Sequence, residues 1–251
     1  MRSKESKSFN NFVPKVLITG GSGFIGTNLI MYLLDNYPNY ELINLDSCSP
    51  RYEDHNQHWK ECDIKDKDSL LNIFSEFNPN YVIHLAAKAS LNGKSIDDFP
   101  DNTIGTQNIV TCINNTSSVN MFLHTSTQYV TRPGLFPESE VDFSPYTFYA
   151  ASKVESEKIV REANLKCNWA ILRPTNIWGP WHSFFPYELW PYLSKTLYLH
   201  PGFKPISKHY GFIGNAVEQI DKILHQVDDQ LLNQVYYITD PPIDNAEWMS
   251  A

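Results

Sequence analysis

The sequence has few cysteines, and none of them is spaced for metal binding or for a redox motif. Its 251 residues include Cys48, Cys62, Cys112 and Cys167, with no CxxC pair and no histidine pair at ligand spacing. Zinc sites and dithiol motifs use such close spacings, and small secreted domains are much richer in cysteine. The pattern predicts reduced thiols in a cytoplasmic protein without a bound metal.

Positive charge and long apolar stretches are also scarce. Twenty Lys and Arg residues stand against 28 Asp and Glu, a formal net charge of -8 at pH 7. An acidic chain is a poor match for nucleic acid or an anionic membrane surface. No stretch is long and apolar enough to span a bilayer, and the polar first residues do not resemble a signal peptide. We expect no nucleic-acid or membrane partner, and a mobile tail at residues 1–14.

The most informative stretch is a run of strand-forming residues that leads directly into a glycine cluster. Residues 16–19 are Val-Leu-Ile-Thr, Gly20, Gly23 and Gly26 follow as GxxGxxG, and an apolar helical pattern begins at Phe24. A strand, a tight turn and a helix start are typical of a dinucleotide-binding unit. Glycine lets the backbone approach a pyrophosphate, and the helix start offers it free N–H groups. A purely structural glycine turn is the alternative.

A carboxylate follows where such a unit binds the ribose of adenosine. Residues 40–46 form the next expected strand and end in Asp46, 20 residues after Gly26. An acid at this point accepts hydrogen bonds from the ribose hydroxyls and repels the 2′-phosphate of NADP. The sequence therefore predicts NAD as the cofactor. Arg51 lies close enough to weaken that preference, and a solvated strand end is the alternative role for Asp46.

Strand-like and helix-like patterns alternate up to residue 173, which favours a parallel sheet covered by helices. Further strands are expected at residues 59–64, 81–87, 121–126 and 169–173, and helices at 67–74, 102–114 and 149–163. Beyond these, a loop-rich region is indicated by interleaved prolines and tryptophans, namely Pro174, Pro180, Pro186, Pro191, Pro201, Pro205, Trp178, Trp181 and Trp190. A helix at 215–226 and a strand at 235–239 that returns to the sheet follow. The fold class is α/β with a doubly wound parallel sheet.

A tyrosine and a lysine share one face of the helix expected at 149–163. Tyr149 and Lys153 are four residues apart, which brings their side chains together. An ammonium and a positively charged nicotinamide both favour the phenolate, so we expect the Tyr149 pKa to fall by about three units. That makes Tyr149 a general base near neutral pH. Thr127 follows the preceding strand and is expected to hold a substrate hydroxyl. An exposed Tyr–Lys pair and an ordinary strand-end hydroxyl are the alternatives.

The ordered set of motifs resembles the extended short-chain dehydrogenases, and more narrowly the NAD-dependent nucleotide-sugar epimerases and dehydratases. The matching segments are the glycine turn at 20–26, residues 63–64, 84–87, 102–106 and 125–127, Tyr149 with Lys153, and residues 172–176. The resemblance runs from residue 15 to the end of the chain. It implies a Rossmann domain at 15–173 and a smaller, loop-rich substrate lobe at 174–251. It also implies tightly held NAD and a catalytic Tyr149/Lys153 pair supported by Thr127.

The resemblance implies a role for each matched residue. The pyrophosphate falls to Gly20, Gly23, Phe24, Ile25 and Gly26, the adenosine ribose to Asp46, and the adenine to Asp63 and Ile64. The remaining cofactor positions are Leu85, Ala86, Ala87, Lys88, Asn102, Thr125, Tyr149, Lys153 on the nicotinamide ribose, and Pro174 near the nicotinamide. The substrate falls to Thr127, Asn176 and Lys208. A structural role explains Asn102 equally well, and His84 is expected to be a packed strand residue.

Several positions depart from the family pattern. Gln128 and Tyr129 stand where the 4,6-dehydratases carry an Asp-Glu pair that eliminates water, so dehydratase activity is not expected. Residues 130–132 are Val-Thr-Arg in place of Val-Tyr-Gly. Lys208 replaces an arginine that grips the diphosphate, and a lysine lacks the bidentate fork. Typical members are longer, so we expect a truncated C-terminus and an incomplete substrate pocket.

The sequence therefore predicts an NAD-dependent nucleotide-sugar epimerase that acts through a transient keto sugar, with Tyr149 as the base. A keto-sugar reductase or a 4,6-dehydratase-like enzyme is the alternative among enzymes. A non-catalytic NAD-binding regulatory or assembly protein is the alternative from another class. By analogy with the family, the chain is expected to form a homodimer through the helix that carries Tyr149 and its neighbour.

Overall fold

The computed structural model describes residues 12–90, 92–135, 137–182, 191, 195 and 207–250. Within these residues, seven strands form one sheet in the order β10-β6-β5-β4-β1-β2-β3. Every neighbouring pair runs parallel. The strand order reverses between β1 and β4, which is the switch point where open α/β sheets bind ligands. The predicted doubly wound α/β class is confirmed.

The elements of the sheet and its helices follow the predicted alternation. The sheet strands are β1 (Lys15–Thr19), β2 (Glu41–Asp46), β3 (Trp59–Glu61), β4 (Tyr81–His84), β5 (Met121–Thr125), β6 (Asn168–Pro174) and β10 (Gln234–Ile238). The helices are α1 (Phe24–Asn36), α2 (Lys67–Phe77), α3 (Thr106–Asn114), α4 (Phe148–Glu162) and α6 (Ile213–Leu224). Shorter turns are η1 (Glu53–His58), η2 (Ile96–Asp98), the π-helical η3 (Asp101–Gly105), η4 (Gln128–Val130) and η6 (Asp229–Leu231).

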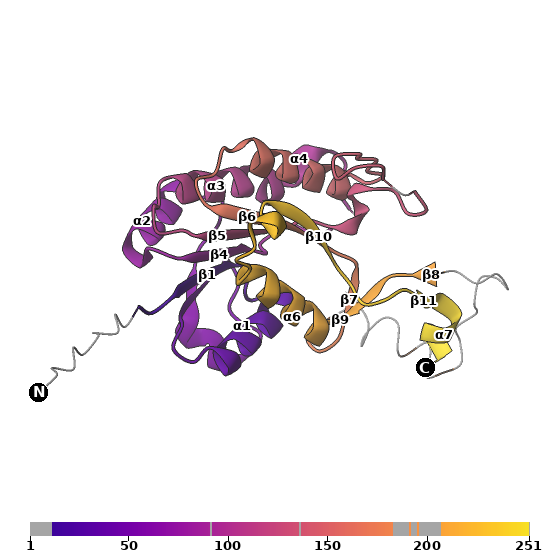
Figure 1. Cartoon of the computed structure of the whole chain (residues 1–251), viewed down its shortest axis with the longest axis horizontal. Helices are drawn as coiled ribbons and strands as arrows, with labels where there is room; N and C mark the ends of the chain where they lie inside the picture. The colour runs from indigo at the N-terminus through magenta and orange to yellow at the C-terminus, as the bar shows by residue number, and fades with distance from the viewer. Residues whose placement is uncertain are drawn as a thin grey trace, which may run out of the picture.

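The helices form one layer on each face of the sheet. Helices α1 and α6 cover one face, and α2, α3 and α4 cover the other (Figure 1). Alternate residues of a strand point to opposite faces, and β1 follows this rule. Val16 and Ile18 pack with α1 and α6, whereas Leu17 packs with α2 and α3. Two apolar cores therefore hold β1 rigidly, and the glycine turn follows directly from its end.

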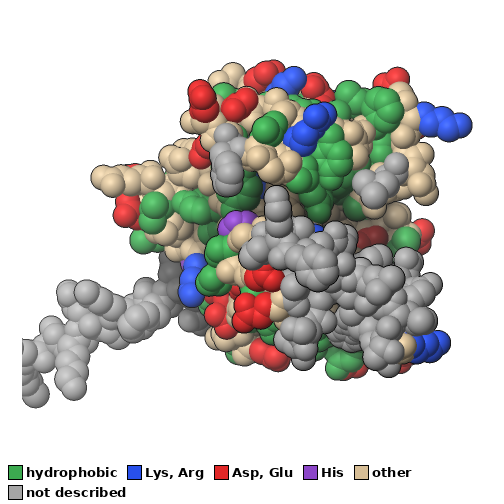
Figure 2. Space-filling view, turned by 90° about the vertical axis from the view of Figure 1, so that its right-hand side faces the viewer, with side chains coloured by type: hydrophobic (Ala, Val, Ile, Leu, Met, Phe, Trp, Pro, Cys, Tyr) green, Lys and Arg blue, Asp and Glu red, His purple; other side chains and the backbone are tan. Residues whose placement is uncertain are grey.

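The smaller elements gather at the right-hand end of the molecule in Figure 1. They are β7 (Asn176–Trp178), which pairs with β9 (Tyr210–Phe212), and β8 (Ser207–Lys208), which pairs with β11 (Ile243–Asp244), followed by α7 (Asn245–Ser250). Hydrophobic side chains gather on the upper part of this end, flanked by Lys or Arg side chains (Figure 2). Helix α6 and strand β10 instead join the central layers. A domain boundary at residue 174 remains a prediction.

Several predicted boundaries are wrong. Strand β4 ends at His84 instead of residue 87 and β3 ends at Glu61 instead of residue 64. After β4 the chain turns toward the glycine turn, where Ala86 packs against Gly20. Pro174 does not close β6 but is its last residue, opposite Ile238, because the next N–H, that of Thr175, donates to the Ile238 carbonyl at 3.1 Å. The helix predicted at 102–114 begins as the π-helical turn η3.

Some sequence predictions fall outside the described residues. These are residues 1–11 of the predicted tail, and Pro186, Trp190, Pro201 and Pro205 of the predicted loop-rich region. Among the helices that the structure describes, none has the length and apolarity needed to cross a membrane.

Candidate active site

The three glycines of the turn between β1 and α1 serve different purposes. Gly20 has φ +75°, and a Cβ there would lie 2.5 Å from the Ala86 backbone nitrogen. A Cβ at Gly26 would lie 2.5 Å from the Gly20 carbonyl oxygen. A Cβ at Gly23 would meet only that same oxygen, at 3.2 Å. Gly20 and Gly26 are thus required by the fold itself, whereas Gly23 leaves open space at the start of α1.

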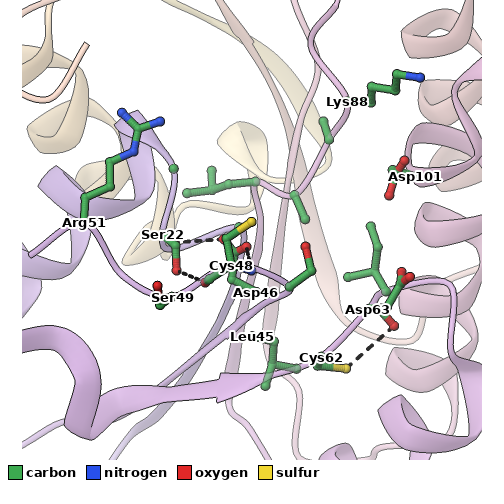
Figure 3. A pocket seen from close by; sticks show the side chains of 17 residues that line it. Ser22, Leu45, Asp46, Cys48, Ser49, Arg51, Cys62, Asp63, Lys88 and Asp101 are labelled. Atoms are coloured by element: carbon green, nitrogen blue, oxygen red, sulfur yellow. Dashed lines mark hydrogen bonds between the residues drawn. The ribbon is translucent and has the colours of Figure 1, made fainter. Parts of the chain in front are cut away.

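A pocket of about 420 Å³ opens beside this turn. It lies at the carboxyl ends of β1, β2 and β4, and Figure 3 shows its side chains, with Arg51 and Lys88 at opposite sides. Nine predicted cofactor residues line it: Gly20, Gly23, Asp46, Asp63, Ile64, Leu85, Ala86, Ala87 and Lys88. Residues far apart in the sequence therefore meet at one site, as the predicted nucleotide unit requires.

The Asp46 carboxylate joins the glycine turn to the loop after β2. One oxygen accepts from the Ser22 backbone N–H at 3.0 Å, and the other accepts from the Cys48 backbone N–H at 3.0 Å. The Ser22 hydroxyl donates to the Cys48 carbonyl at 2.8 Å. An ionised carboxylate has about four acceptor positions, so each oxygen of Asp46 keeps capacity for a further donor in the pocket.

Asn102 links the nucleotide pocket to helix α4. Its side-chain oxygen accepts from the Lys88 N–H at 2.8 Å, and its amide donates to the Lys88 carbonyl at 3.2 Å and to the Ser152 hydroxyl at 2.8 Å. Asn102 is fully buried and does not line the pocket. It holds the Lys88 loop against α4, which agrees with its predicted position near the cofactor and the active-site helix.

Tyr149 lies in the first turn of α4, whose N-cap is Thr147. Burial raises the Tyr149 pKa, and a hydrogen bond with Thr127 lowers it in part. The expectation that neighbouring charge lowers this pKa is therefore wrong for the protein by itself, because burial disfavours the phenolate more strongly than its neighbours favour it. The predicted contact between Thr127 and the phenol is present.

Lys153 is buried one helical turn after Tyr149, with 1% of its surface exposed. Burial lowers its pKa to about 8, and the charge of Glu157 opposes that shift. Its ammonium makes neither an ion pair nor a side-chain hydrogen bond within the described part of the chain. A buried ammonium without a partner is unfavourable, and this one is suited to a ligand that brings hydroxyl groups.

A second pocket of about 950 Å³ lies beyond Thr127, between η4 and the small sheets. The predicted substrate residues Asn176 and Lys208 both line it, together with Gln128 and Tyr129. Thr127 itself does not, although it directly precedes Gln128. Several aromatic side chains complete the wall: Tyr146, Tyr210, Tyr237 and Trp248. The pocket combines flat apolar surface with basic groups.

The Asn176 side chain is already engaged by the protein. Its oxygen accepts from the Tyr129 phenol at 2.8 Å, and its amide donates to the His209 carbonyl at 3.2 Å. One amide hydrogen therefore remains for a substrate. Burial raises the Tyr129 pKa, so its phenol is a neutral donor near pH 7.

The two tryptophans predicted to anchor the nucleotide do not line the second pocket. Trp178 packs on Phe212 and Trp248, with ring centroids 5.2 and 5.9 Å away. The Trp181 carbonyl accepts from Arg51 at 2.7 Å, beside the nucleotide pocket. Their interpretation as substrate anchors is wrong in this structure, because their packing directs them to other parts of the molecule.

Some predicted cofactor residues lie outside both pockets. Phe24, Ile25 and Gly26 form the first turn of α1, and Pro174 is buried at the end of β6. The Thr125 hydroxyl is buried and has no hydrogen-bond partner among the residues that the structure describes. His84 is buried between Thr19 and Thr106, at 2.6 and 3.1 Å, as expected of a packed strand residue.

Sequence reasoning missed other pocket residues. The nucleotide pocket also contains Ser22, Cys48, Ser49 and Asp101, and the second pocket contains Tyr146, His209, Tyr210, Tyr237 and Trp248. Ser22 and Cys48 flank the glycine turn and Asp46, so position next to a strand end could have indicated them. The aromatic residues come from separated segments and carry no common signal.

Comparison with known proteins agrees with this geometry. Residues 16–238 match the NAD dependent epimerase/dehydratase family. The chain is 29% identical to a dTDP-D-glucose 4,6-dehydratase of Dictyostelium discoideum, over 94% of this chain and 61% of that protein. It is 30% identical to the human dTDP-D-glucose 4,6-dehydratase, over 67% of this chain and 53% of that protein. The chain thus spans between about half and three fifths of the length of these relatives.

Solved structures share the fold. The UDP-glucose 4-epimerase of Thermotoga maritima with UDP-glucose superposes with a TM-score of 0.77 at 23% identity, covering 94% of this chain and 80% of that one. The UDP-glucose 4-epimerase of Thermus thermophilus in complex with NAD gives 0.73 at 24% identity, covering 94% and 81%. The motifs, the sheet order and the match over residues 16–238 agree. The chain belongs to the NAD dependent epimerase/dehydratase family.

Proposed function

We propose that the protein is an NAD-dependent nucleotide-sugar epimerase that works through a transient keto sugar. The observation that carries the proposal is the grouping of three side chains: the Tyr149 phenol hydrogen-bonded to Thr127, with the buried Lys153 ammonium one helical turn away. A phenol beside an ammonium and a hydroxyl is suited to take a proton from an alcohol.

This group lies where the two pockets approach one another. Gln128 follows Thr127 directly and lines the second pocket. On the other side, Ser152 of α4 contacts Asn102, which holds Lys88 of the nucleotide pocket. A cofactor in one pocket and a sugar in the other would therefore both reach the active-site helix.

The nucleotide pocket fits NAD. Gly23, the N-cap of α1, has no side chain to satisfy the first N–H groups of the helix, and these groups favour a pyrophosphate. The spare acceptor positions of Asp46 suit the two ribose hydroxyls of adenosine and repel a 2′-phosphate. The unpaired Lys153 ammonium suits the hydroxyls of the second ribose. When bound, NAD supplies the acceptor and then the donor of the transferred hydride.

The proposed cofactor contacts extend to the other matched residues. We assign the pyrophosphate to Gly20, Gly23, Phe24, Ile25 and Gly26, and the adenine to Asp63 and Ile64. We assign the remaining surface of the cofactor to Leu85, Ala86, Ala87 and Lys88, with Thr125 and Pro174 near the nicotinamide and Asn102 as a support for the Lys88 loop.

The protein's own groups move the proton. Tyr149 takes the proton from the hydroxyl of the reacting carbon, while Thr127 orients that hydroxyl by hydrogen bonding. Burial raises the Tyr149 pKa in the protein alone, so the Lys153 ammonium and the positive charge of the cofactor must stabilise the phenolate in the complex. The same phenol returns the proton when the keto sugar is reduced from its other face.

The second pocket suits a nucleotide-diphosphate sugar. Lys208 is exposed at its wall and provides positive charge for a diphosphate. Asn176 retains one amide hydrogen for the substrate. Tyr210 and Trp248 stack on each other with centroids 4.3 Å apart, which presents flat aromatic surface near Lys208.

A 4,6-dehydratase is the second candidate, because relatives with that name match the chain over much of its length. Elimination of water needs an acid and a base beside the sugar. The two residues after Thr127 are Gln128 and Tyr129, an amide and a neutral phenol, and the phenol donates to Asn176. These groups favour the epimerase. A keto-sugar reductase would need a cofactor renewed after each turnover, and a non-catalytic regulator would have no need of Tyr149 and Lys153.

We further propose that the protein works in the cytoplasm as a homodimer. Its cysteines are free in the structure, as expected of a reducing compartment. Ile104 of η3 and Phe148 of α4 are exposed by 54% and 47%, and both elements adjoin α3 and α4. Light scattering, with Ile104→Asp as the disrupting variant, tests the dimer.

The direct test of the activity is NMR of the purified protein incubated with NAD and a panel of UDP-, dTDP- and GDP-sugars. The proposal expects an inverted sugar without net NADH, and no inversion by Tyr149→Phe. A 4-keto-6-deoxy product would favour the dehydratase. Tight NAD binding without any product would favour the regulator.

A further inference from the structure

A buried ion pair lies directly behind the active-site helix. Glu157 of α4 is 0% exposed and Arg173 of β6 is 1% exposed. The guanidinium binds the carboxylate through two atoms, with Nε to Oε1 at 2.9 Å and a terminal nitrogen to Oε2 at 2.8 Å. Arg173 also donates to the Glu140 carbonyl at 2.7 Å and to the Tyr237 phenol at 3.2 Å. Two charges are kept out of water only when such pairing is complete.

Glu157 makes one more contact, and it leads to the catalytic group. The Ser126 hydroxyl donates to Glu157 Oε1 at 2.5 Å, and the Ser126 N–H donates to the Leu172 carbonyl at 2.6 Å. Ser126 is thus held by both its side chain and its backbone. The next residue is Thr127, whose hydroxyl bonds with the Tyr149 phenol. A shift of Ser126 would therefore move Thr127.

Glu157 also lies four residues after Lys153, on the same face of α4. The other ionisable groups near Lys153 carry no negative charge at pH 7. Burial and the Lys153 charge both lower the pKa of His84, to about 3, and that of His124, and burial raises the Tyr149 pKa. Within the described residues, Glu157 is the negative charge that acts on Lys153.

We propose that Glu157 is a positioning residue of the active site, which anchors Thr127 through Ser126 and keeps the Lys153 ammonium charged. Arg173 holds the Glu157 carboxylate in place for both tasks. This inference rests on the proposed chemistry at Tyr149 and extends it to a residue that touches neither cofactor nor substrate. A purely structural brace between α4 and β6 would make the same ion pair but would not affect Lys153.

The test compares three variants with the wild type. Glu157→Gln keeps the size and the acceptor for Ser126 but removes the charge. Because it leaves Arg173 unpaired, a second variant, Glu157→Gln with Arg173→Met, removes both charges and guards against a failure to fold. Arg161→Gln is the matched control, since Arg161 lies 3.8 Å from Glu157 but is partly exposed. Circular dichroism establishes that each variant is folded.

The decisive readout is the pH titration of the Lys153 side chain by NMR of ¹³C-labelled lysine, assigned with Lys153→Arg. The wild type is expected to titrate near pH 8, and both Glu157 variants about one pH unit lower. The alkaline limb of turnover shifts by the same amount, and kcat falls about tenfold with little change in KM. Arg161→Gln leaves all of these unchanged.

An unchanged Lys153 titration in a folded Glu157 variant would overturn the inference and leave a structural brace. Because the titration needs no substrate, it decides this inference even if no sugar is turned over. Absence of turnover in the wild type would instead count against the proposed function alone.

Discussion

The Tyr129 phenol donates a 2.8 Å hydrogen bond to the side-chain oxygen of Asn176, across the wall of the second pocket. Burial raises the pKa of this phenol, so Tyr129 serves as a neutral donor. Together with Gln128, it occupies the positions directly after Thr127. The structure therefore has two neutral side chains where water elimination would need an acid and a base.

Replacing Tyr129 by phenylalanine tests the importance of this bond. Tyr129→Phe leaves the Asn176 oxygen without its donor, so the amide is free to turn away from the substrate. We expect KM for the nucleotide sugar to rise several-fold, with kcat nearly unchanged, and the free energy of unfolding to fall by about 1 kcal/mol. Steady-state kinetics and urea unfolding measure both effects. A fall in kcat at constant KM would mean that Tyr129 takes part in the chemistry.

Two alanine substitutions in the glycine turn should separate folding from cofactor binding. Gly26→Ala places a Cβ 2.5 Å from the Gly20 carbonyl, and we expect it to lower the free energy of unfolding by about 3 kcal/mol. Gly23→Ala meets that oxygen only at 3.2 Å, so it should fold but bind NAD about tenfold more weakly. Thermal unfolding and calorimetric titration with NAD provide the measurements. Equal effects of both variants on stability would contradict this division.

Removing the Asp46 charge should change the choice of cofactor. Asp46→Asn keeps the size of the side chain but loses charge-assisted acceptance, worth about 1.5 to 3 kcal/mol. We expect the Kd for NAD to rise about tenfold or more and the binding of NADP to improve. Fluorescence titration with both cofactors tests this, and Asp68→Asn in the exposed first turn of α2 is the control. Unchanged discrimination against NADP would assign the preference to another group.

Lys153 should reduce stability in favour of function. Its pKa is about 8 in the folded protein, against 10.5 for the ordinary side chain, so the unfolded chain binds more protons between these pH values. Its contribution to stability is therefore unfavourable below pH 8 and becomes less so as the pH rises to 10.5. We expect Lys153→Met to abolish turnover and to raise the free energy of unfolding at pH 7 by up to about 3 kcal/mol.

The matched control for this substitution is Lys158→Met, since Lys158 is an exposed residue of the same helix. Urea unfolding at pH 7 and pH 10.5 measures the difference, which should nearly vanish at the higher pH. A loss of stability at pH 7 in Lys153→Met would show that the ammonium has a partner in the folded protein.

The sequence predicted those parts of the site that depend on local pattern. The glycine turn, Asp46 and the Tyr149/Lys153 pair each follow from spacing within one or two elements, and the structure brings their neighbours to one edge of the sheet. Periodicity did not predict where β4 ends. Residues 85–87 are apolar like the strand before them, but they leave it because Ala86 packs on Gly20, a contact between distant parts of the chain.

Contacts between separated side chains were out of reach for the same reason. The bonds of Tyr129 to Asn176 and of Asn102 to Ser152 join residues 47 and 50 positions apart. The Tyr149 pKa was expected to fall because spacing indicates a nearby ammonium. Burial, which spacing does not describe, acts in the opposite direction and dominates.

The measurement that tests the central claim most directly is turnover in D₂O with NMR analysis of the recovered sugars. An epimerase returns the same hydrogen to the carbon it oxidised, so the account predicts an inverted sugar without deuterium on any carbon. A dehydratase removes the hydrogen at C5 as a proton and replaces it from solvent. Deuterium at C5, together with a 4-keto-6-deoxy product, would contradict the account.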